Sequence, residues 1–388
     1  MATPAAPELE VRLPSGEALA VGEGCASVAE LRDSVAAALR VAASNVRLLA
    51  GVEALSDAQR LADVGGGASG PLAVTAVVMW QVPALSGHSD GVVRRWDLSA
   101  PDERGPTDAC QGHGGPVLAV CADWRAGRAL TGSADWTLRL WGLRAAGEGL
   151  ELEAVLQGHE GPVRAVRADF GQDRGLSGSE DGSARLWDLA AGECLAVFEG
   201  HHGRAVLAVG LGLGEAASWA VSGGRDARLC VWDLASWQLR GRLEGHGDTV
   251  LALHLDASGE RMVSGSKDRR LRVWDVGAMA CRAALAGHAG AVTAVAADFE
   301  AERAVSGSED ATLRLWDLAT CACLASLADW LGPVAALSVN FGAQRAVSGS
   351  EDGALSLWDL SGQGKRLAAR EDGEDSGCAH AVSIEGGS

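Results

Sequence analysis

Histidine, serine and aspartate, the residue types of a hydrolytic triad, recur along this chain of 388 residues. Ser306 and Asp310 lie in the segment SGSEDATLRLWDL at 306–318, and near copies of this segment occupy 177–189 and 348–360. In a hydrolase, the three residue types act as nucleophile, general base and orienting carboxylate in one site. The copies raise the question of whether these residues serve catalysis or structure.

Other sequence motifs of chemistry do not support an enzyme either. The chain has no H-E-x-x-H, G-x-S-x-G or Walker A run. The stretch GGGASG at 65–70 fits G-x-G-x-x-G, but no helix follows it, so we interpret it as a linker. The nine cysteines form no C-x-x-C pair, and Cys321 and Cys323 are too close for a usual zinc pair. We therefore expect no catalytic residue, no cofactor and no metal.

The charge balance bears on the kind of partner. The formal net charge is −18, whereas contact with a phosphate backbone requires clustered Lys and Arg. No apolar run reaches the ~18 residues of a membrane span, and no basic stretch followed by an apolar run suggests a signal peptide. We expect an intracellular protein, cytoplasmic or nuclear, that binds other proteins or peptides, contacts neither nucleic acid nor membrane directly, and is monomeric by itself.

A tryptophan followed by Asp or Gly marks a repeat of 42–46 residues. Such a period with a Trp-Asp ending is typical of four-stranded propeller blades. The seven tryptophans are Trp96, Trp141, Trp187, Trp232, Trp274, Trp316 and Trp358.

Each repeat unit reads as four strands. In one unit these are AVTAVAADF (291–299), RAVSGS (303–308), LRLW (313–316) and CACLASLA (321–328), with Gly and Asp at the turns between them. A lone four-stranded sheet cannot bury both of its faces, but seven sheets stacked radially can. The sequence therefore predicts a mainly β protein built on a repeated unit.

These repeats resemble the WD40 family, which implies a seven-bladed β-propeller over about 85–383. The resemblance also implies that a His, a Ser or Thr, an Asp and the Trp form a hydrogen-bonded relay in each blade, which would satisfy the buried Asp. One set has either His201 or His202 with Ser222, Asp226 and Trp232, and the seventh unit keeps Asp352 and Trp358 but has Asp329–Trp330 in place of Gly-His. The other sets are His113/Thr131/Asp135/Trp141, His159/Ser177/Asp181/Trp187, His246/Ser264/Asp268/Trp274 and His288/Ser306/Asp310/Trp316.

Residues 9–79 do not share the repeat and read as strand, strand, helix, strand, strand. The helix is expected over 25–39, with Ser27 as N-cap and Glu30 completing a capping box. The stretch Arg47–Gly65 resembles ubiquitin, which implies a small α+β, β-grasp domain. We expect this ubiquitin-like domain at 1–80 and the propeller at 81–388.

The expected N-terminal domain departs from ubiquitin where conjugation would matter. It contains no lysine, and no free Gly-Gly end follows its last strand. Leu48 falls where the hydrophobic binding patch of ubiquitin lies, although Pro14 replaces another patch residue. The resemblance therefore implies a domain that binds or docks through Leu48, or one that only folds beside the propeller.

The innermost strand of the first blade has two candidates. The tail at 367–388 aligns with 324–344, which indicates that Ala379–Glu385 completes the first blade and leaves no open edge in the ring. The alternative is Leu72–Met79, which would otherwise close the N-terminal sheet.

The predicted function lies on the propeller surface. Loops from the outer to the inner strand, and from the second to the third strand, share one rim that commonly binds partners. We expect a non-enzymatic scaffold or adaptor, with a ubiquitin-pathway substrate adaptor or a ribosome-assembly factor as alternatives. A basic arc is predicted on blades 4 and 5, with acidic blades elsewhere. The candidate rim residues are Trp136, Arg164, Glu180, Arg204, Arg225, Lys267, Arg269, Glu309, Trp330 and Glu351.

Overall fold

The chain divides into two compact units, Met1–Gln81 and Val82–Ser388. Each unit is described by itself. The computed structural model describes residues 9–12, 18–19, 27–39, 46–50, 53–54, 72–78, 83–98, 105–144, 149–213, 218–328, 332–350, 354–361, 365–370 and 379–384.

The first unit combines one helix with a five-stranded sheet. Helix α1 (Val28–Leu39) begins after Ser27, whose Oγ accepts a hydrogen bond from the Glu30 N–H at 3.2 Å. The sheet order is β2-β1-β5-β3-β4, with β1 parallel to β5 and β3 antiparallel to β5. No helix among the described residues is long and apolar enough to cross a membrane. The strands are β1 (Leu9–Arg12), β2 (Ala18–Leu19), β3 (Val46–Ala50), β4 (Glu53–Ala54) and β5 (Leu72–Val78).

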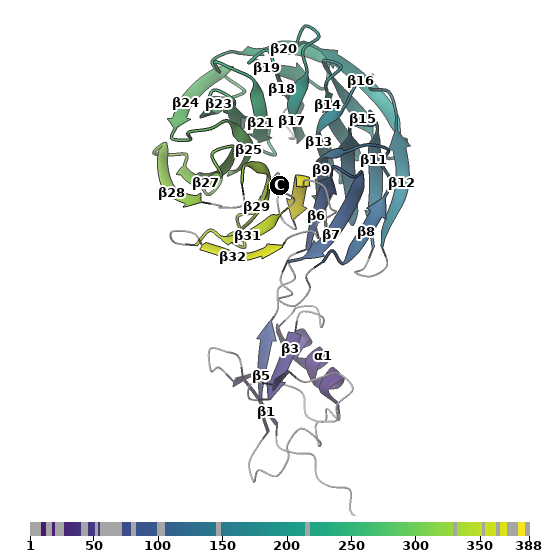
Figure 1. Cartoon of the computed structure of the whole chain (residues 1–388), viewed down its shortest axis with the longest axis vertical. Helices are drawn as coiled ribbons and strands as arrows, with labels where there is room; N and C mark the ends of the chain where they lie inside the picture. The colour runs from purple at the N-terminus through teal and green to yellow at the C-terminus, as the bar shows by residue number, and fades with distance from the viewer. Residues whose placement is uncertain are drawn as a thin grey trace, which may run out of the picture. The chain divides into compact units, whose positions relative to one another are not determined.

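The second unit is a seven-bladed β-propeller: its described residues form seven four-stranded antiparallel sheets arranged in a ring (Figure 1). From the inside outwards, the strands are β33 (Ala379–Ile384), β6 (Pro83–His88), β7 (Val92–Asp97) and β8 (Asp108–Gln111) in blade 1; β9 (Val117–Asp123), β10 (Arg128–Ser133), β11 (Leu138–Leu143) and β12 (Leu150–Leu156) in blade 2; β13 (Val163–Asp169), β14 (Arg174–Ser179), β15 (Ser183–Asp188) and β16 (Glu193–Glu199) in blade 3; and β17 (Val206–Leu213), β18 (Ser218–Gly224), β19 (Leu229–Asp233) and β20 (Gln238–Leu243) in blade 4.

The remaining three blades have the same order. Their strands are β21 (Val250–Leu255), β22 (Arg261–Ser266), β23 (Arg270–Asp275) and β24 (Ala280–Ala286) in blade 5; β25 (Val292–Asp298), β26 (Arg303–Ser308), β27 (Thr312–Asp317) and β28 (Ala322–Ala328) in blade 6; and β29 (Val334–Asn340), β30 (Arg345–Ser350), β31 (Leu355–Asp359) and β32 (Lys365–Arg370) in blade 7.

The two ends of the propeller chain meet in blade 1. Strand β33 pairs antiparallel with β6, so the end of the chain supplies the innermost strand of the first blade (Figure 1). Ser383 on β33 also accepts a hydrogen bond from the Ala122 N–H of blade 2 at 3.2 Å. Strand β5, which overlaps the other candidate, pairs with β1 and β3 of the first unit. This closure leaves the inner edge of β6 paired.

The sequence pattern of each blade matches its burial. The second strand, RGLSGS in blade 3, is buried along nearly its whole length because both of its faces contact other blades or strands. Its Gly178 is needed for close approach, since a Cβ there would lie 2.7 Å from Val206 Cγ1 of blade 4. Trp187 is 1 % exposed and packs with Leu130 and Leu138 of blade 2. Truncating such a buried Trp typically costs about 3–5 kcal/mol, so these tryptophans join neighbouring blades.

Candidate functional site

The relay residues of blade 3 form one chain of hydrogen bonds from a surface turn to the core. With its proton on Nδ1, His159 donates to Asp181 Oδ2 at 2.7 Å, and its Nε2 lies 2.7 Å from Ser177 Oγ. The indole N–H of Trp187 donates to the same Ser177 oxygen at 2.8 Å. The Asp lies in the turn between the second and third strands, so the relay ties that turn to the strand interior.

Four further blades repeat this geometry, with His–Asp, His–Ser or His–Thr, and Trp–Ser or Trp–Thr distances of 2.7–3.0 Å. In blade 4 the histidine is His201, whereas His202 is exposed. The sets are His113/Thr131/Asp135/Trp141, His201/Ser222/Asp226/Trp232, His246/Ser264/Asp268/Trp274 and His288/Ser306/Asp310/Trp316.

The electrostatics of blade 3 suit a relay between buried groups. Burial lowers the pKa of His159, and Arg185 lowers it further, so the ring is neutral at pH 7. Burial opposes ionisation of Asp181, but the Ser183 hydroxyl, His159 and two backbone N–H groups lower its pKa to about 2. His159 is 6 % exposed and Ser177 is fully buried. This geometry satisfies polar groups inside the blade and holds the serine oxygen away from the surface.

Blades 1 and 7 depart from this relay. In blade 1, His88 comes from the second strand itself and places Nε2 2.6 Å from Ser86 Oγ, which also accepts the Trp96 indole N–H. His88 was not among the predicted relay residues, although it follows Ser-Gly at a position where five other blades have Ser and blade 4 has Gly224. In blade 7, Trp358 donates to Ser348 Oγ at 2.9 Å. Predicted residues Trp330, Glu351 and Asp352 lie outside the described residues.

The rim is the end of the propeller formed by two kinds of loop: those between the second and third strands, and those that lead into each first strand. Five blades join these loops by a backbone hydrogen bond of 2.8–3.0 Å, from the residue before the turn Asp to a carbonyl just ahead of the first strand. The same backbone position is therefore presented in each of these five blades. The residues that occupy it are Ala134, Glu180, Arg225, Lys267 and Glu309.

A second rim position requires a left-handed backbone. The residue after the turn Asp is Gly182 in blade 3, with φ of 87°, and glycine adopts such a φ without steric cost. Blade 2 has Trp136 at φ of 72° and blade 5 has Arg269 at φ of 68°. Trp136 is 51 % exposed. These two large side chains are therefore kept on the surface although their backbone is strained.

The predicted rim charges fall into two groups. In blade 3, Glu180 and Arg164 form an ion pair at 2.7 Å and largely neutralise each other. In blades 4 and 5, Arg204, Arg225 and Lys267 are exposed and, like Arg269, form no ion pair within the described residues. Glu309 is exposed on blade 6.

The predicted binding residue of the first unit, Leu48, lies in β3, opposite Ala76 of β5.

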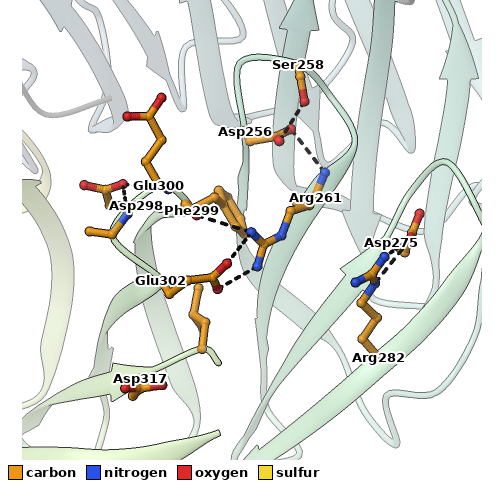
Figure 2. A network of polar contacts seen from close by, with 12 residues as sticks. Asp256, Ser258, Arg261, Asp275, Arg282, Asp298, Phe299, Glu300, Glu302 and Asp317 are labelled. Atoms are coloured by element: carbon orange, nitrogen blue, oxygen red, sulfur yellow. Dashed lines mark hydrogen bonds and ion pairs between the residues drawn. The ribbon is translucent and has the colours of Figure 1, made fainter. Parts of the chain in front are cut away.

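The opposite end of the propeller differs from the rim in its charge pairing. Arg261 of blade 5 forms two ion-pair contacts of 2.8 Å with Glu302 of blade 6, and it donates to the Phe299 carbonyl (Figure 2). Asp256 accepts the Arg261 backbone N–H in the same network. Blades 2 and 3 are joined in the same way, since Arg128 contacts Asp173 at 2.6 Å. Arginines at this end thus connect adjacent blades.

An exposed tryptophan at this opposite end was not predicted from the sequence. Trp237 lies in the turn between β19 and β20, is 50 % exposed, and has φ of 58°. Gly192 fills the same position of the turn in blade 3, with φ of 72°. The substitution of Trp for Gly at that position is visible in the repeat alignment and could have revealed it.

The inner strands surround a cavity of 1230 Å³ at the centre of the ring. Much of its lining is small and apolar, including Ala165, Ala208, Ala252 and Ala294. Within the described part of the chain, no group of His, Cys, Asp and Glu side chains is placed to hold a metal ion.

Comparison with known protein families identifies the repeat. The WD domain, G-beta repeat model matches residues 105–142, 150–188, 192–233, 237–275, 279–317 and 321–359, which together make up more than half of the chain. No curated protein matches the sequence.

Proposed function

Because the chain belongs to the WD40-repeat family, we propose that it is a non-enzymatic scaffold or adaptor that binds other proteins or peptides through the rim of its propeller. The observation that carries this proposal is Trp136, a half-exposed tryptophan held at φ of 72° where blade 3 has glycine. Exposed tryptophans are enriched among the residues that dominate binding energy in interfaces, and backbone strain is concentrated at functional positions.

The chain contains a matched control for this residue. Trp237 is equally exposed and also has a left-handed backbone, but it lies at the opposite end of the propeller. Alanine fits the rim position, since Ala227 and Ala311 already occupy it at φ of 62° and 60°. The Trp237 position also accepts side chains smaller than Trp, since Met279 and Cys321 occupy it in blades 5 and 6 at φ of 53° and 59°. The two Trp-to-Ala variants therefore differ mainly in which end of the molecule they change.

The test is affinity purification of the intact chain, Trp136→Ala and Trp237→Ala, followed by quantitative mass spectrometry and binding measurements on the recovered partner. We expect Trp136→Ala to weaken binding by about 2 kcal/mol, roughly thirtyfold, as for an interface anchor. Trp237→Ala should bind the same partner normally. Retention of every partner by Trp136→Ala, or equal losses in both variants, would contradict rim binding.

A second candidate function concerns the first unit, which we propose to be a ubiquitin-like domain that recruits an effector. The support is its strand order, β2-β1-β5-β3-β4, with α1 between β2 and β3 in the chain and β1 parallel to β5. This order agrees with the β-grasp resemblance of the sequence. The protein would then act as a substrate adaptor in a ubiquitin pathway or as a ribosome-assembly factor that docks through this domain.

Deletion of residues 1–80 tests this second candidate, with Leu48→Ala as the finer variant. Loss of ligase or proteasome subunits on deletion would favour the ubiquitin pathway, whereas loss of pre-ribosomal proteins would favour ribosome assembly. If all partners remain bound, the first unit recruits no effector and binding depends on the propeller alone.

A further inference from the structure

We propose that the rim of blades 4 and 5 binds an acidic segment of a partner protein, one rich in Asp and Glu. This inference rests on the proposed rim function and specifies the chemistry of the partner. It concerns a surface that we name the basic arc, formed by Arg204, Arg225, Lys267, Arg269 and Arg270. All five residues are exposed.

The backbone places these cations on one surface. The Arg225 N–H donates to the Ala205 carbonyl at 3.0 Å, and the Lys267 N–H donates to the Thr249 carbonyl at 2.9 Å. These bonds fix equivalent positions on adjacent blades. The blades are in direct contact, since a Cβ on Gly223 of blade 4 would lie 2.8 Å from Val250 of blade 5.

One residue of the arc, Arg270, occupies a position where other blades have a hydroxyl that binds the turn Asp. In blades 2, 3 and 6, the residue two positions after the turn Asp is Thr137, Ser183 or Thr312, and its hydroxyl donates to that Asp at 2.6–2.7 Å. In blade 5 this residue is Arg270, which gives the Asp only its backbone N–H at 3.0 Å. Its side chain is left exposed to solvent.

The cations of the arc are also unusual because they lack acidic partners. In blade 4, Arg228 lies two positions after the turn Asp, as Arg270 does in blade 5, but it forms an ion pair with Glu244 at 3.1 Å. Other arginines of the propeller also form ion pairs. The five residues of the arc form no ion pair with any described residue. In a chain with a net charge of −18, such a local excess of positive charge is well suited to an external anion.

The acids closest in sequence to the arc are engaged below or beside it. Asp268 accepts hydrogen bonds from His246 and from the Gly247 N–H, both at under 3 Å. Asp226 faces His201 at 2.9 Å. Asp248, in the loop that leads into β21, accepts the N–H of its own neighbour Thr249. These carboxylates are held by local donors, whereas the cations of the arc extend to solvent.

The flanking blades limit what kind of anion fits. Blade 6 presents the exposed Glu309, and blade 3 presents the neutralised Glu180–Arg164 pair. A long polyanion such as a nucleic acid would extend beyond the arc toward Glu309 and meet the net negative charge of the chain, within a Debye length of ~8–10 Å. A short acidic run with neutral or basic flanks avoids that repulsion. The geometry thus points to a protein segment of mixed charge.

The test uses a fluorescein-labelled peptide with a central run of glutamates flanked by Gly, Ser and one Lys, and measures fluorescence anisotropy with the full chain. The variant reverses two arc charges, Lys267→Glu with Arg269→Glu. The matched control reverses Lys365→Glu with Arg125→Glu, two exposed cations away from the rim that give the same change in net charge. Thermal unfolding of both variants verifies folding.

We expect the arc variant to bind roughly tenfold or more weakly than the native chain and the control to bind within about twofold, because two cations of the arc become acids that repel the peptide. Binding should weaken between ~0.05 M and ~0.15 M salt. Absence of binding by the native chain, or equal losses in both double variants, would overturn the proposal. So would arc-dependent binding of a single-stranded oligonucleotide that is tighter than that of the peptide.

This inference and the proposed function can fail separately. If the recovered partner is lost with Trp136→Ala but retained with the arc variant, the rim function holds and the acidic-segment proposal is wrong. If neither variant loses a partner and the peptide does not bind, both are wrong.

Discussion

Blades 3 and 4 are neighbours with the same four-residue relay, yet they differ around the aspartate. Asp181 of blade 3 accepts four hydrogen bonds, from the His159 ring, the Glu160 N–H, and both the N–H and the hydroxyl of Ser183. Asp226 of blade 4 accepts two, and its buried Oδ2 has no partner among the described residues. Both blades have the same strand arrangement. The comparison therefore separates what both blades keep, the His–Ser–Trp chain, from the extra hydrogen bonds to the Asp that blade 4 lacks.

The same two blades also differ in the charge of their histidines. In blade 3, Arg185 lies on the third strand and helps burial to lower the pKa of His159. Blade 4 has Cys230 at the matching position. Burial opposes protonation of His201 there, but the hydrogen bond with Asp226 and the nearby Cys230 raise its pKa to about 9. Blade 4 therefore holds a charged His–Asp pair where blade 3 has a neutral histidine beside a carboxylate.

The largest expected difference between the blades follows from removing each aspartate. Asp181→Ala removes the acceptor of four hydrogen bonds, three of them partly buried, and should lower the free energy of unfolding by about 3–4 kcal/mol. At pH 9.5, where His201 has largely lost its charge, Asp226→Ala should cost about 2 kcal/mol, because fewer donors are lost and a buried unpartnered oxygen is removed. Urea denaturation monitored by tryptophan fluorescence measures both. Glu160→Ala, an exposed change on the same loop as His159, is the control. An equal or greater cost at Asp226 would show that the number of hydrogen bonds to the Asp does not determine its contribution to stability.

The repeated parts of these blades could be predicted from the sequence, because each depends on contacts that recur at a fixed spacing. The tryptophans and the Ser, Asp and His of the relays fall into this class. The sequence could not decide whether His201 or His202 belongs to the relay, because the path of the loop determines which ring reaches Asp226 and Ser222. The Arg164–Glu180 pair and the blade-to-blade contacts of Arg261 depend on side-chain directions that spacing alone does not give. Trp237 lies in a turn at the opposite end, outside the rim loops from which the binding residues were predicted.

The second expected difference is in pH dependence. Since the pKa of His201 is raised from 6.5 to about 9, the stability that its charge contributes is complete below pH 6.5 and is lost as the pH rises through 9. His159 has the opposite sign: its pKa is lowered, so its contribution is complete above pH 6.5 and is lost as the pH falls below that value. Between pH 6.5 and pH 9.5, the free energy of unfolding should therefore fall by about 3 kcal/mol more in the native chain than in His201→Gln. His159→Gln is the matched variant and should leave this alkaline loss unchanged. Identical pH profiles for the native chain and His201→Gln would refute a charged pair in blade 4.

The smallest expected effect tests the backbone strain that distinguishes the turn of blade 4 from that of blade 3. Gly192 has φ of 72°, and a Cβ there would meet only Leu156 at 3.9 Å, so Gly192→Ala adds strain without a clash. We expect it to lower the unfolding free energy by about 1 kcal/mol. Gly247→Ala is the control, because that glycine has no left-handed φ and its Cβ would meet Asp268 only at 3.8 Å. A cost at Gly192 alone would show that a side chain at a left-handed φ strains this backbone. Trp237 of blade 4 and Trp136 of blade 2 would then carry a comparable strain. If Gly192→Ala costs nothing, the positive φ of these tryptophans loses its meaning as a sign of function, and the case for Trp136 as a binding residue would depend on its exposure alone.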